Sequence, residues 1–187
     1  MRVAILTISD AGARGERTDT SGEAIENWAT GRRYDVVSRA LVPDESVQIV
    51  GQLIDWCDTN AADLVLTTGG TGLSERDVTP EATRAVIERE ALGIAERIRI
   101  LSIHAFPRAA LSRGLAGVRK KTLIVNLPGS TSGVNDGLDA LGPIVDHAVS
   151  VLRGDRLDHP ETSGAGVILR SEATKDPSAA EEESATQ

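Results

Sequence analysis

Residues 63–81 read DLVLTTGGTGLSERDVTPE and combine several signals of one type of fold. The first six, residues 63–68, are almost continuously apolar or β-branched, which is typical of a parallel strand covered on both faces. A glycine-rich loop follows. Thr79 and Pro80 then provide an N-cap and a first-turn proline, so a helix is expected over residues 81–90. A buried strand followed by a loop and a helix is the repeating unit of an open α/β sheet.

The same alternation of strand and helix extends over most of the chain. Three further apolar runs are predicted to form buried strands, namely residues 3–8, 34–42 and 122–127. Helical spacing of apolar residues predicts helices from Thr20, from Ser46, from Gly93 to about residue 104, and over residues 134–141 and 143–152. Thr20 and Glu23 are expected to form a capping box at the first helix. We therefore predict a single three-layer α/β domain, with a mostly parallel sheet and helices on both faces.

The two ends of the chain differ in composition. The folded domain is predicted to occupy residues 1–160. Residues 161–187 are rich in Ser, Ala and Glu and contain only one short apolar patch. Such a segment buries too little surface to offset the entropy of ordering it, so we expect this tail to be disordered.

Composition excludes several classes of function. The net charge is −8 and only 2% of the residues are aromatic, so neither a basic nucleic-acid-binding face nor base-stacking platforms are expected. Cys57 is the only cysteine, which excludes an intrachain disulfide and a thiolate metal cluster. The apolar N-terminal run is too short for a signal peptide, and no stretch approaches the ~20 apolar residues of a membrane span. We expect a cytoplasmic protein without membrane or nucleic-acid partners.

The glycine-rich loop carries the strongest functional signal. Its glycines leave backbone N–H groups open to close approach, and a nest of such groups binds anions, phosphate in particular. The loop lacks both the Gly-Lys-Ser/Thr of a Walker A motif and the Gly-x-Gly-x-x-Gly of a dinucleotide-binding fold. A tight turn with a solvated Asp77 is the alternative. The residues of this loop predicted to bind phosphate are Thr68, Gly69, Gly70, Thr71, Gly72 and Arg76.

The other three predicted strands also end in polar residues, at the edge where an open α/β sheet binds ligands. Ser9 and Asp10 begin a long polar loop, Asp44 follows the second strand, and residues 128–130 precede a helix N-terminus that suits a phosphate. Taken alone, these segments also fit a surface loop, a helix N-cap and a capped turn. Together with Asp77 they predict metal-assisted phosphate binding, with carboxylates holding Mg²⁺. The residues of these segments predicted to bind substrate are Ser9, Asp10, Pro128, Gly129 and Ser130.

Several motifs resemble those of the MoaB/Mog family. They are LTISD (6–10), LVPD (41–44), TGGTG (68–72), RDVTPEAT (76–83), LSR (111–113) and LIVNLPG (123–129). The likeness extends from about residue 2 to residue 160. It implies a three-layer α/β domain, usually trimeric, that binds molybdopterin. Members with adenylyltransferase activity join AMP from ATP to the terminal phosphate of molybdopterin, with Mg²⁺, and release pyrophosphate.

The resemblance also implies roles for individual residues. Asp44 and Asp77 match the catalytic carboxylates and are expected to hold Mg²⁺, directly or through water. Ser9, Ser102 and Asn126 match substrate-binding positions. The expected function is thus adenylyl transfer to molybdopterin in molybdenum cofactor biosynthesis, by a homotrimer with a molybdenum insertase as a downstream partner.

Two alternatives remain open at this point. A non-catalytic molybdopterin-binding or carrier module would use the same pocket without turnover. Some MoaB-type members lack the aspartate at this position. This chain has Asp44 and in this respect resembles the catalytically active members. Residues 14–22, in contrast, resemble MoaB-type and plant-type members more than the shorter Mog pattern, which leaves the subfamily open. A molybdenum insertase would normally need further domains.

Overall fold

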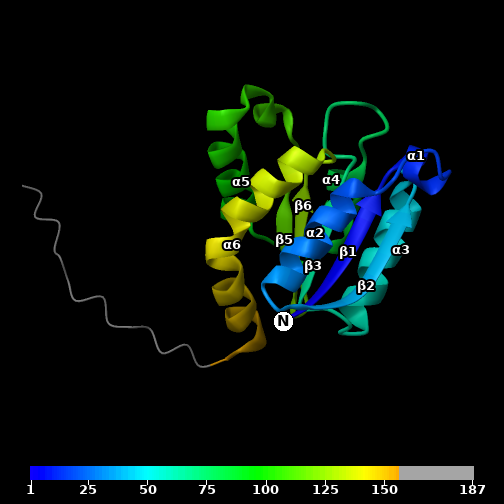
Figure 1. Cartoon of the computed structure of the whole chain (residues 1–187). Coiled ribbons are helices and arrows are strands. Elements are labelled where there is room, and N and C mark those ends of the chain that lie inside the picture. Colours follow the sequence, from blue (N-terminus) through cyan, green and yellow to red (C-terminus); the bar gives the residue numbers. More distant parts are fainter. Residues whose placement is uncertain (156–187) are drawn as a thin grey trace, which may run out of the picture. The chain divides into compact units, whose positions relative to one another are not determined.

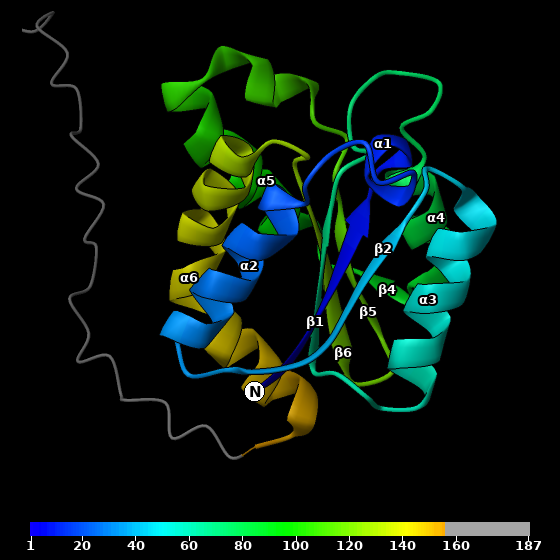
Figure 2. The same ribbon diagram turned by 45° about the vertical axis from the view of Figure 1, so that its right-hand side comes forward.

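Figures 1 and 2 show a single sheet between two layers of helices, and the computed structural model describes residues 1–155. The predicted domain end at residue 160 and the predicted tail, residues 161–187, lie outside the described residues. The strand order is β2 (Asp35–Val42), β1 (Arg2–Ile8), β3 (Leu64–Thr68), β6 (Thr122–Leu127), β5 (Ala116–Arg119) and β4 (Arg89–Glu90). The first four are parallel, whereas β5 is antiparallel to β6 and β4 is antiparallel to β5. The predicted mostly parallel α/β sheet is confirmed.

Helices cover both faces of the sheet, as predicted (Figure 2). One face packs against α2 (Thr20–Gly31), α5 (Leu92–Ala105) and α6 (Thr131–Arg153), and the other against α3 (Ser46–Asp58) and α4 (Thr79–Val86). Two short helices, α1 (Asp10–Ala13) and the 3-10 helix η1 (Pro107–Leu111), lie in loops. Among residues 1–155, none of the helices is long and apolar enough to cross a membrane.

Strand β2 differs from the prediction of a strand buried on both faces. It lies at the edge of the sheet and pairs only with β1. Along most of its length, side chains alternate between exposed and partly buried positions, and Val37 is 40% exposed. An edge strand has fewer neighbours to cover it, so its apolar composition overstated its burial.

The sequence did not predict β5 and β4. Residues 81–90 were expected to form one helix, but α4 ends at Val86, and the chain then pairs with β5, where the Glu88 N–H donates to the Val118 carbonyl at 2.8 Å. Strand β4 is only two residues long and lacks β-branched or aromatic residues. It forms because of its partner strand, a contact that local propensity does not reveal.

Helix α6 is continuous over 23 residues, although two separate helices were predicted. Pro143 lies inside it and removes one backbone donor. Leu138, Leu141 and Val145, on either side of the proline, are almost completely buried. Packing of these side chains onto the sheet therefore maintains the helix through the position where local rules predicted a break.

Helix starts at the carboxyl edge of the sheet also differ from the prediction. Asp19, not Thr20, caps α2, because the Asp19 side chain accepts a backbone N–H there and is fixed by the Thr7 hydroxyl at 2.8 Å. Thr79 is the first residue of α4 and not its cap. Asp44 precedes α3 without making any cap hydrogen bond to it. The capping alternative for Asp44 is therefore wrong.

Candidate active site at the carboxyl edge of the sheet

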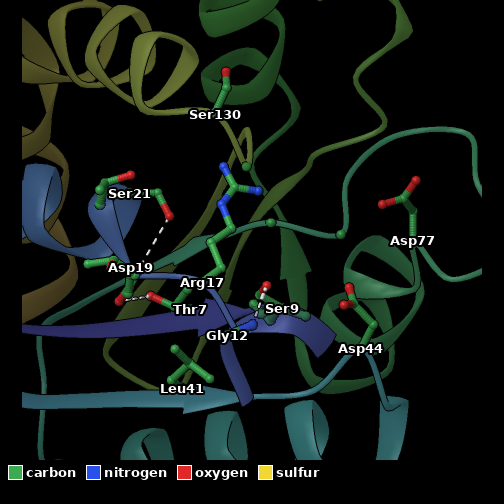
Figure 3. Close-up of a pocket in the computed structure, with 16 residues that line it drawn as sticks. Thr7, Ser9, Gly12, Arg17, Asp19, Ser21, Leu41, Asp44, Asp77 and Ser130 are labelled. Atoms are coloured by element: carbon green, nitrogen blue, oxygen red, sulfur yellow. Dashed lines mark hydrogen bonds between the residues drawn. The ribbon is translucent and has the colours of Figure 1, made fainter. Parts of the chain in front are cut away.

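The carboxyl edge of the sheet is hollowed where the chain changes direction. From β1 the chain passes to β2 on one side and then to β3 on the other, so the loops after β1 and β3 diverge and leave a crevice. A cavity of about 320 Å³ opens there (Figure 3). Its walls include Ser9, Gly12, Arg17, Asp19, Ser21, Asp44, Gly69, Gly70, Asp77, Gly129 and Ser130. Loops from all four parallel strands contribute, as the sequence predicted for this edge.

Two glycines form the wall of this cavity and could not be replaced without strain. Gly69 has φ +100° and Gly70 has φ +60°, a region that side chains rarely tolerate. A Cβ on Gly69 would collide with the carbonyl oxygen of Ile8, and a Cβ on Gly70 would collide with the Thr79 hydroxyl. The same added Cβ on Gly70 would lie only 3.0 Å from Asp44 Oδ1. Bare backbone is therefore required beside this carboxylate.

Asp44 presents one carboxylate oxygen to the cavity. Its Oδ2 accepts the Asp10 N–H at 2.8 Å, while its Oδ1 has no hydrogen-bond partner within residues 1–155. Burial raises the pKa of Asp44, and the charges of Asp10 and Asp77 raise it further, against the hydrogen bond from the Asp10 backbone. A partly buried carboxylate in this environment is stabilised by any cation that binds beside it.

Asp77 is held in a similar way from the opposite loop. Its Oδ2 accepts the Ser74 N–H at 2.8 Å, and its main-chain carbonyl accepts a hydrogen bond from Arg113. Its Oδ1 has no partner in the part of the chain that the structure describes. Figure 3 shows Asp77 and Asp44 at the same cavity. The two predicted catalytic carboxylates are thus brought together, each with one oxygen fixed and one free.

A third carboxylate at the cavity, Asp19, is already neutralised. Arg39 Nη2 lies 2.8 Å from Asp19 Oδ2, which also accepts the Thr7 hydroxyl. Although burial opposes it, these bonds and the Gly22 N–H lower the pKa of Asp19. Asp19 therefore shapes the wall and caps α2, whereas the free oxygens belong to the other two aspartates.

Arg17 is a site residue that the sequence prediction missed. Figure 3 shows its side chain extended into the cavity. Within residues 1–155 its guanidinium forms neither a hydrogen bond nor an ion pair. Arg14, the other arginine of the same loop, pairs with Glu16 at 2.9 Å. The short spacing of that pair was a signal that could have singled out Arg17 as the remaining cation.

A second cavity, of about 640 Å³, adjoins the first. Both are lined by Gly70, Asp77, Gly129 and Ser130. Helix α5 and η1 supply an apolar wall that includes Ile98, Phe106 and Leu111. Ser102, predicted as a site residue, also lines this cavity, and its buried hydroxyl has no partner among the described residues. Thr71, Gly72 and Pro128 from the predicted set line it as well.

Thr68 and Asn126, also predicted to bind substrate, lie behind the cavity walls. The Thr68 hydroxyl donates to the Pro128 carbonyl at 2.7 Å. The Asn126 amide donates to the hydroxyls of Thr67 and Thr83 and accepts the N–H of Leu115. Both are buried, and neither is among the residues that line these two cavities. Their contacts hold the ends of β3 and β6 together under the site.

The predicted pair Asp10 and Arg76 also lies outside both cavity linings. Arg76 donates to both carboxylate oxygens of Asp10 at 2.9 to 3.1 Å, and Asp10 accepts the Asp44 N–H at 3.0 Å. The hydrogen bonds from Arg76 and from the Asp44 backbone lower the pKa of Asp10. Arg76 also pairs with Glu45 at 3.0 Å. The charges of Asp10 and Arg76 are therefore already paired within the protein.

The free oxygens of Asp44 and Asp77 fit a divalent cation that arrives with phosphate. No group of three or more His, Cys, Asp or Glu side chains within residues 1–155 is arranged to hold a metal by itself. Mg²⁺ is commonly bound by one or two carboxylates together with substrate phosphates and water, and it prefers oxygen ligands. The two carboxylates supply oxygen ligands of this kind, and the bare backbone and the Arg17 guanidinium at the same cavity suit the phosphates.

Comparisons with known proteins agree with this arrangement. The family model described as "Probable molybdopterin binding domain" matches residues 4–147. A molybdopterin adenylyltransferase of Escherichia coli (strain K12) is 40% identical over 156 residues, covering 80% of each chain. The crystal structure of the molybdopterin biosynthesis enzyme MoaB from Thermus thermophilus superposes with a TM-score of 0.78 at 50% identity, covering 82% of this chain and 96% of that chain. The Mog protein of Mycobacterium ulcerans gives 0.76 at 39% identity, covering 80% and 97%.

These matches span the sheet, both helical layers and all four loops at the carboxyl edge. The family model begins in β1 and ends in α6, so it includes every residue discussed at the two cavities. The glycine-rich loop, the two aspartates and the switch in strand order therefore all lie within the part of the chain that the family model matches. The chain belongs to the MoaB/Mog family of molybdopterin-binding domains.

Proposed function

We propose that this chain transfers the adenylyl group of ATP to the terminal phosphate of molybdopterin, in molybdenum cofactor biosynthesis. The relatives named molybdopterin adenylyltransferase support this reaction. The observation that carries the proposal is the placement of two free carboxylate oxygens, one on Asp44 at the first cavity and one on Asp77, which lines both cavities. Two substrates seated in adjoining cavities would meet beside these oxygens.

Asp44 and Asp77 would hold Mg²⁺ together with the phosphates of ATP, directly or through water. When bound, the ion would neutralise negative charge that develops on the phosphoryl oxygens. The backbone of Gly69 and Gly70 forms the adjacent wall, where N–H groups can approach the substrate closely. Arg17, which has no partner among residues 1–155, would bind the outer phosphates.

The second cavity would seat a planar ring system. Its apolar wall excludes water from a heterocycle, and the Ser102 hydroxyl has a hydrogen bond to give to a ring heteroatom. Ser130 lies at the N-terminus of α6 and lines both cavities, a position suited to a phosphate between them. Ser9 lines the first cavity and would contact the substrate seated there.

The reaction requires positioning more than proton transfer. A terminal oxygen of the molybdopterin phosphate attacks the α-phosphorus of ATP, and the bond from that phosphorus to the bridging oxygen of pyrophosphate breaks. The second pKa of a phosphate monoester is about 6, so the attacking oxygen is already ionised at neutral pH and needs no general base. The residues of the site would hold the two phosphates in line and stabilise the transition state electrostatically.

Pyrophosphate release from Mg-ATP tests this function. The purified chain should release pyrophosphate only when molybdopterin is also present, and the adenylylated pterin should appear in equal amount by mass spectrometry. A non-catalytic carrier, the alternative reading, would bind molybdopterin in a calorimeter without releasing pyrophosphate. That outcome would exclude the enzyme and favour the carrier.

We also propose that the chain forms a homotrimer in the cytoplasm and passes its product to a molybdenum insertase. Ile100, Leu101 and Ile103 of α5 are more than one third exposed, and apolar side chains gathered on one helix support burial against another copy. Light scattering on a size-exclusion column should give three times the mass of one chain. A monomer mass at micromolar concentration would contradict the proposed assembly.

A further inference from the structure

Two loops at the active-site edge hold each other by a reciprocal pair of hydrogen bonds. The Asp10 N–H donates to Asp44 Oδ2 at 2.8 Å, and the Asp44 N–H donates to Asp10 Oδ1 at 3.0 Å. Each aspartate therefore accepts the backbone N–H of the other. Rotation of the Asp44 carboxylate would break one of these bonds, so the contact also fixes its free Oδ1 toward the cavity.

Arg76 connects a third loop to this pair. Its Nε and Nη2 donate to Asp10 at 2.9 to 3.1 Å, and its Nη1 and Nη2 donate to Glu45 Oε1 at 3.0 Å. Arg76 immediately precedes Asp77 in the sequence. The loop that carries the second cavity carboxylate is thus tied to the loop that carries the first.

This connection acts on the exposed part of the loop, between the Gly72 and Asp77 carbonyls that Arg113 holds. Residues 73–76 are exposed, and Leu73 is 67% exposed. Asp44 and Asp77 carry like charges at one cavity, and their repulsion favours separation of the two loops until a cation binds. An ion pair that links the loops opposes this separation.

We infer that Asp10 and Arg76 are positioning residues, which hold Asp44 and Asp77 ready for a divalent cation bound to phosphate. We call the four residues Asp10, Asp44, Arg76 and Asp77 the loop clasp. The inference deepens the proposed function and rests on it for the role of the two carboxylates. It differs from the prediction made from the sequence, in which Asp10 and Arg76 bind substrate directly.

The hydrogen bonds that the Arg76 guanidinium already makes favour a positioning role over direct substrate binding. All three of its side-chain nitrogens already donate to carboxylates, so a substrate phosphate would have to displace Asp10 or Glu45. Arg17, in contrast, extends into the cavity and has no partner within residues 1–155. Among the described residues, Arg17 is therefore free for a ligand, whereas Arg76 is already bound to other protein groups.

A double-mutant cycle on the full chain tests the loop clasp. The variants are Asp10→Ala, Arg76→Ala and the double variant, with kcat and KM measured for Mg-ATP and for molybdopterin. Each single variant should lower kcat by about 10- to 100-fold, because misplacement of the carboxylates by about 1 Å has effects of this size. The double variant should be no slower than the slower single variant, since both changes release the same contact. The KM for molybdopterin should stay within about threefold of wild type.

A second measurement reports on the carboxylates without turnover. Mn²⁺ binding in the presence of α,β-methylene-ATP, followed by electron paramagnetic resonance, should weaken about tenfold in both single variants, as for other residues that orient metal ligands. Arg14→Ala is the matched control, because it removes an exposed ion pair in the same first loop outside the loop clasp and should leave all values unchanged. Asp10→Asn keeps an oxygen for the Asp44 N–H, so it should recover part of the loss and serves if Asp10→Ala unfolds.

Two results would overturn the inference. Losses in the single variants that multiply in the double variant would show that Asp10 and Arg76 act independently. A higher KM for Mg-ATP in Arg76→Ala, with unchanged Mn²⁺ affinity, would identify Arg76 as a direct phosphate ligand. Failure of the proposed function would look different, because the wild-type chain would then release no pyrophosphate, while Mn²⁺–nucleotide binding would still measure the loop clasp.

Discussion

Asp63 and Asp44 lie at opposite edges of the same sheet and differ in how their charges are satisfied. Asp63 immediately precedes β3 at the amino edge and is 4% exposed. It accepts the Arg2 backbone N–H at 2.6 Å and the Arg2 guanidinium at 2.8 Å, and it also pairs with Arg153. Asp44 follows β2 at the carboxyl edge, accepts one backbone N–H and leaves its other oxygen free.

The pKa of Asp63 is lowered from its ordinary value, whereas the pKa of Asp44 is raised. Burial alone would raise the pKa of Asp63, but the hydrogen bonds from Arg2 and the ion pair with Arg153 lower it to about 2. Burial also raises the pKa of Asp44, and no arginine contacts that carboxylate to reverse the effect. The chain thus supplies cations to the aspartate at the amino edge and leaves the one at the carboxyl edge to a ligand. We infer that the amino edge contributes stability and the carboxyl edge contributes function.

The largest effect expected from this comparison is the loss of activity in Asp77→Asn. The amide oxygen still accepts the Ser74 N–H, but the free oxygen loses its negative charge, so a cation is held weakly. Pyrophosphate release should fall about 1,000-fold, comparable to removal of a principal electrostatic contact in other enzymes. The melting temperature should change by less than about 2 °C. Stopped assays of pyrophosphate and differential scanning fluorimetry measure the two quantities.

The neighbouring acid provides the control for this substitution. Glu75→Gln changes an exposed charge two residues away in the same loop and should leave turnover near the wild-type rate. Near-normal turnover in Asp77→Asn would show that this carboxylate has no role in the reaction.

At the amino edge of the sheet, we expect a substitution to lower stability and to leave activity unchanged. Asp63→Ala leaves Arg2 and Arg153 side by side without their shared anion, and such a loss from a buried pair destabilises by about 3 kcal/mol. The lower end of the usual range applies, because both arginines are 37% exposed. Urea unfolding followed by circular dichroism measures this change. Turnover per folded molecule should remain close to wild type, since Asp63 is far from the carboxyl edge along β3.

A surface pair provides the comparison for Asp63→Ala. Asp58 pairs with Arg119 and Lys120 at the surface, so Asp58→Ala should destabilise much less. Equal destabilisation by the two substitutions would remove the distinction between a buried and a surface ion pair in this chain.

Lowering the pH should remove the contribution of Asp63 to the free energy of unfolding. Its pKa in the folded chain, about 2, lies below the ordinary value of 3.8, so the ionised group favours the folded state. This contribution is complete above pH 4 to 5 and is lost as the pH falls through 4 toward 2, for a total of about 2 kcal/mol. The difference in unfolding free energy between wild type and Asp63→Asn should therefore shrink between pH 6 and pH 2.5. A difference that stays constant over this range would contradict the assigned pKa.

The sequence predicted the carboxyl-edge loops well because their signals are local. Gly69 and Gly70 are recognisable as a bare-backbone loop after a buried strand, and Asp77 lies just before a helix in the same segment. The four parallel strands were likewise predictable from continuous apolar runs. Strand β4, in contrast, has no local signal, because Arg89–Glu90 becomes a strand only through pairing with β5.

The differences between the predicted and the observed surroundings of the arginines have a related cause. Composition indicates that an arginine near a glycine-rich loop can bind phosphate, and it does not indicate which acids already surround that arginine. Arg76 meets Asp10 from a loop 66 residues away in sequence, and Arg17 remains without a partner among the described residues. The pairing of Arg76 depends on long-range contacts, so the sequence alone does not show that Arg76 is already occupied.

Arg17 provides the finest test of the difference between satisfied and unsatisfied charges. Arg17→Ala should raise the KM for Mg-ATP about tenfold and leave kcat nearly unchanged, because a charge-assisted bond to an outer phosphate contributes to binding away from the reacting phosphorus. Arg17→Lys keeps the charge without the planar fork and should recover part of the affinity. Arg14→Ala removes a cation from the same loop that is already paired with Glu16, so its KM should match wild type. Equal effects of the two alanine substitutions would indicate general electrostatic attraction by the loop, and the free guanidinium at the cavity would then have no specific role.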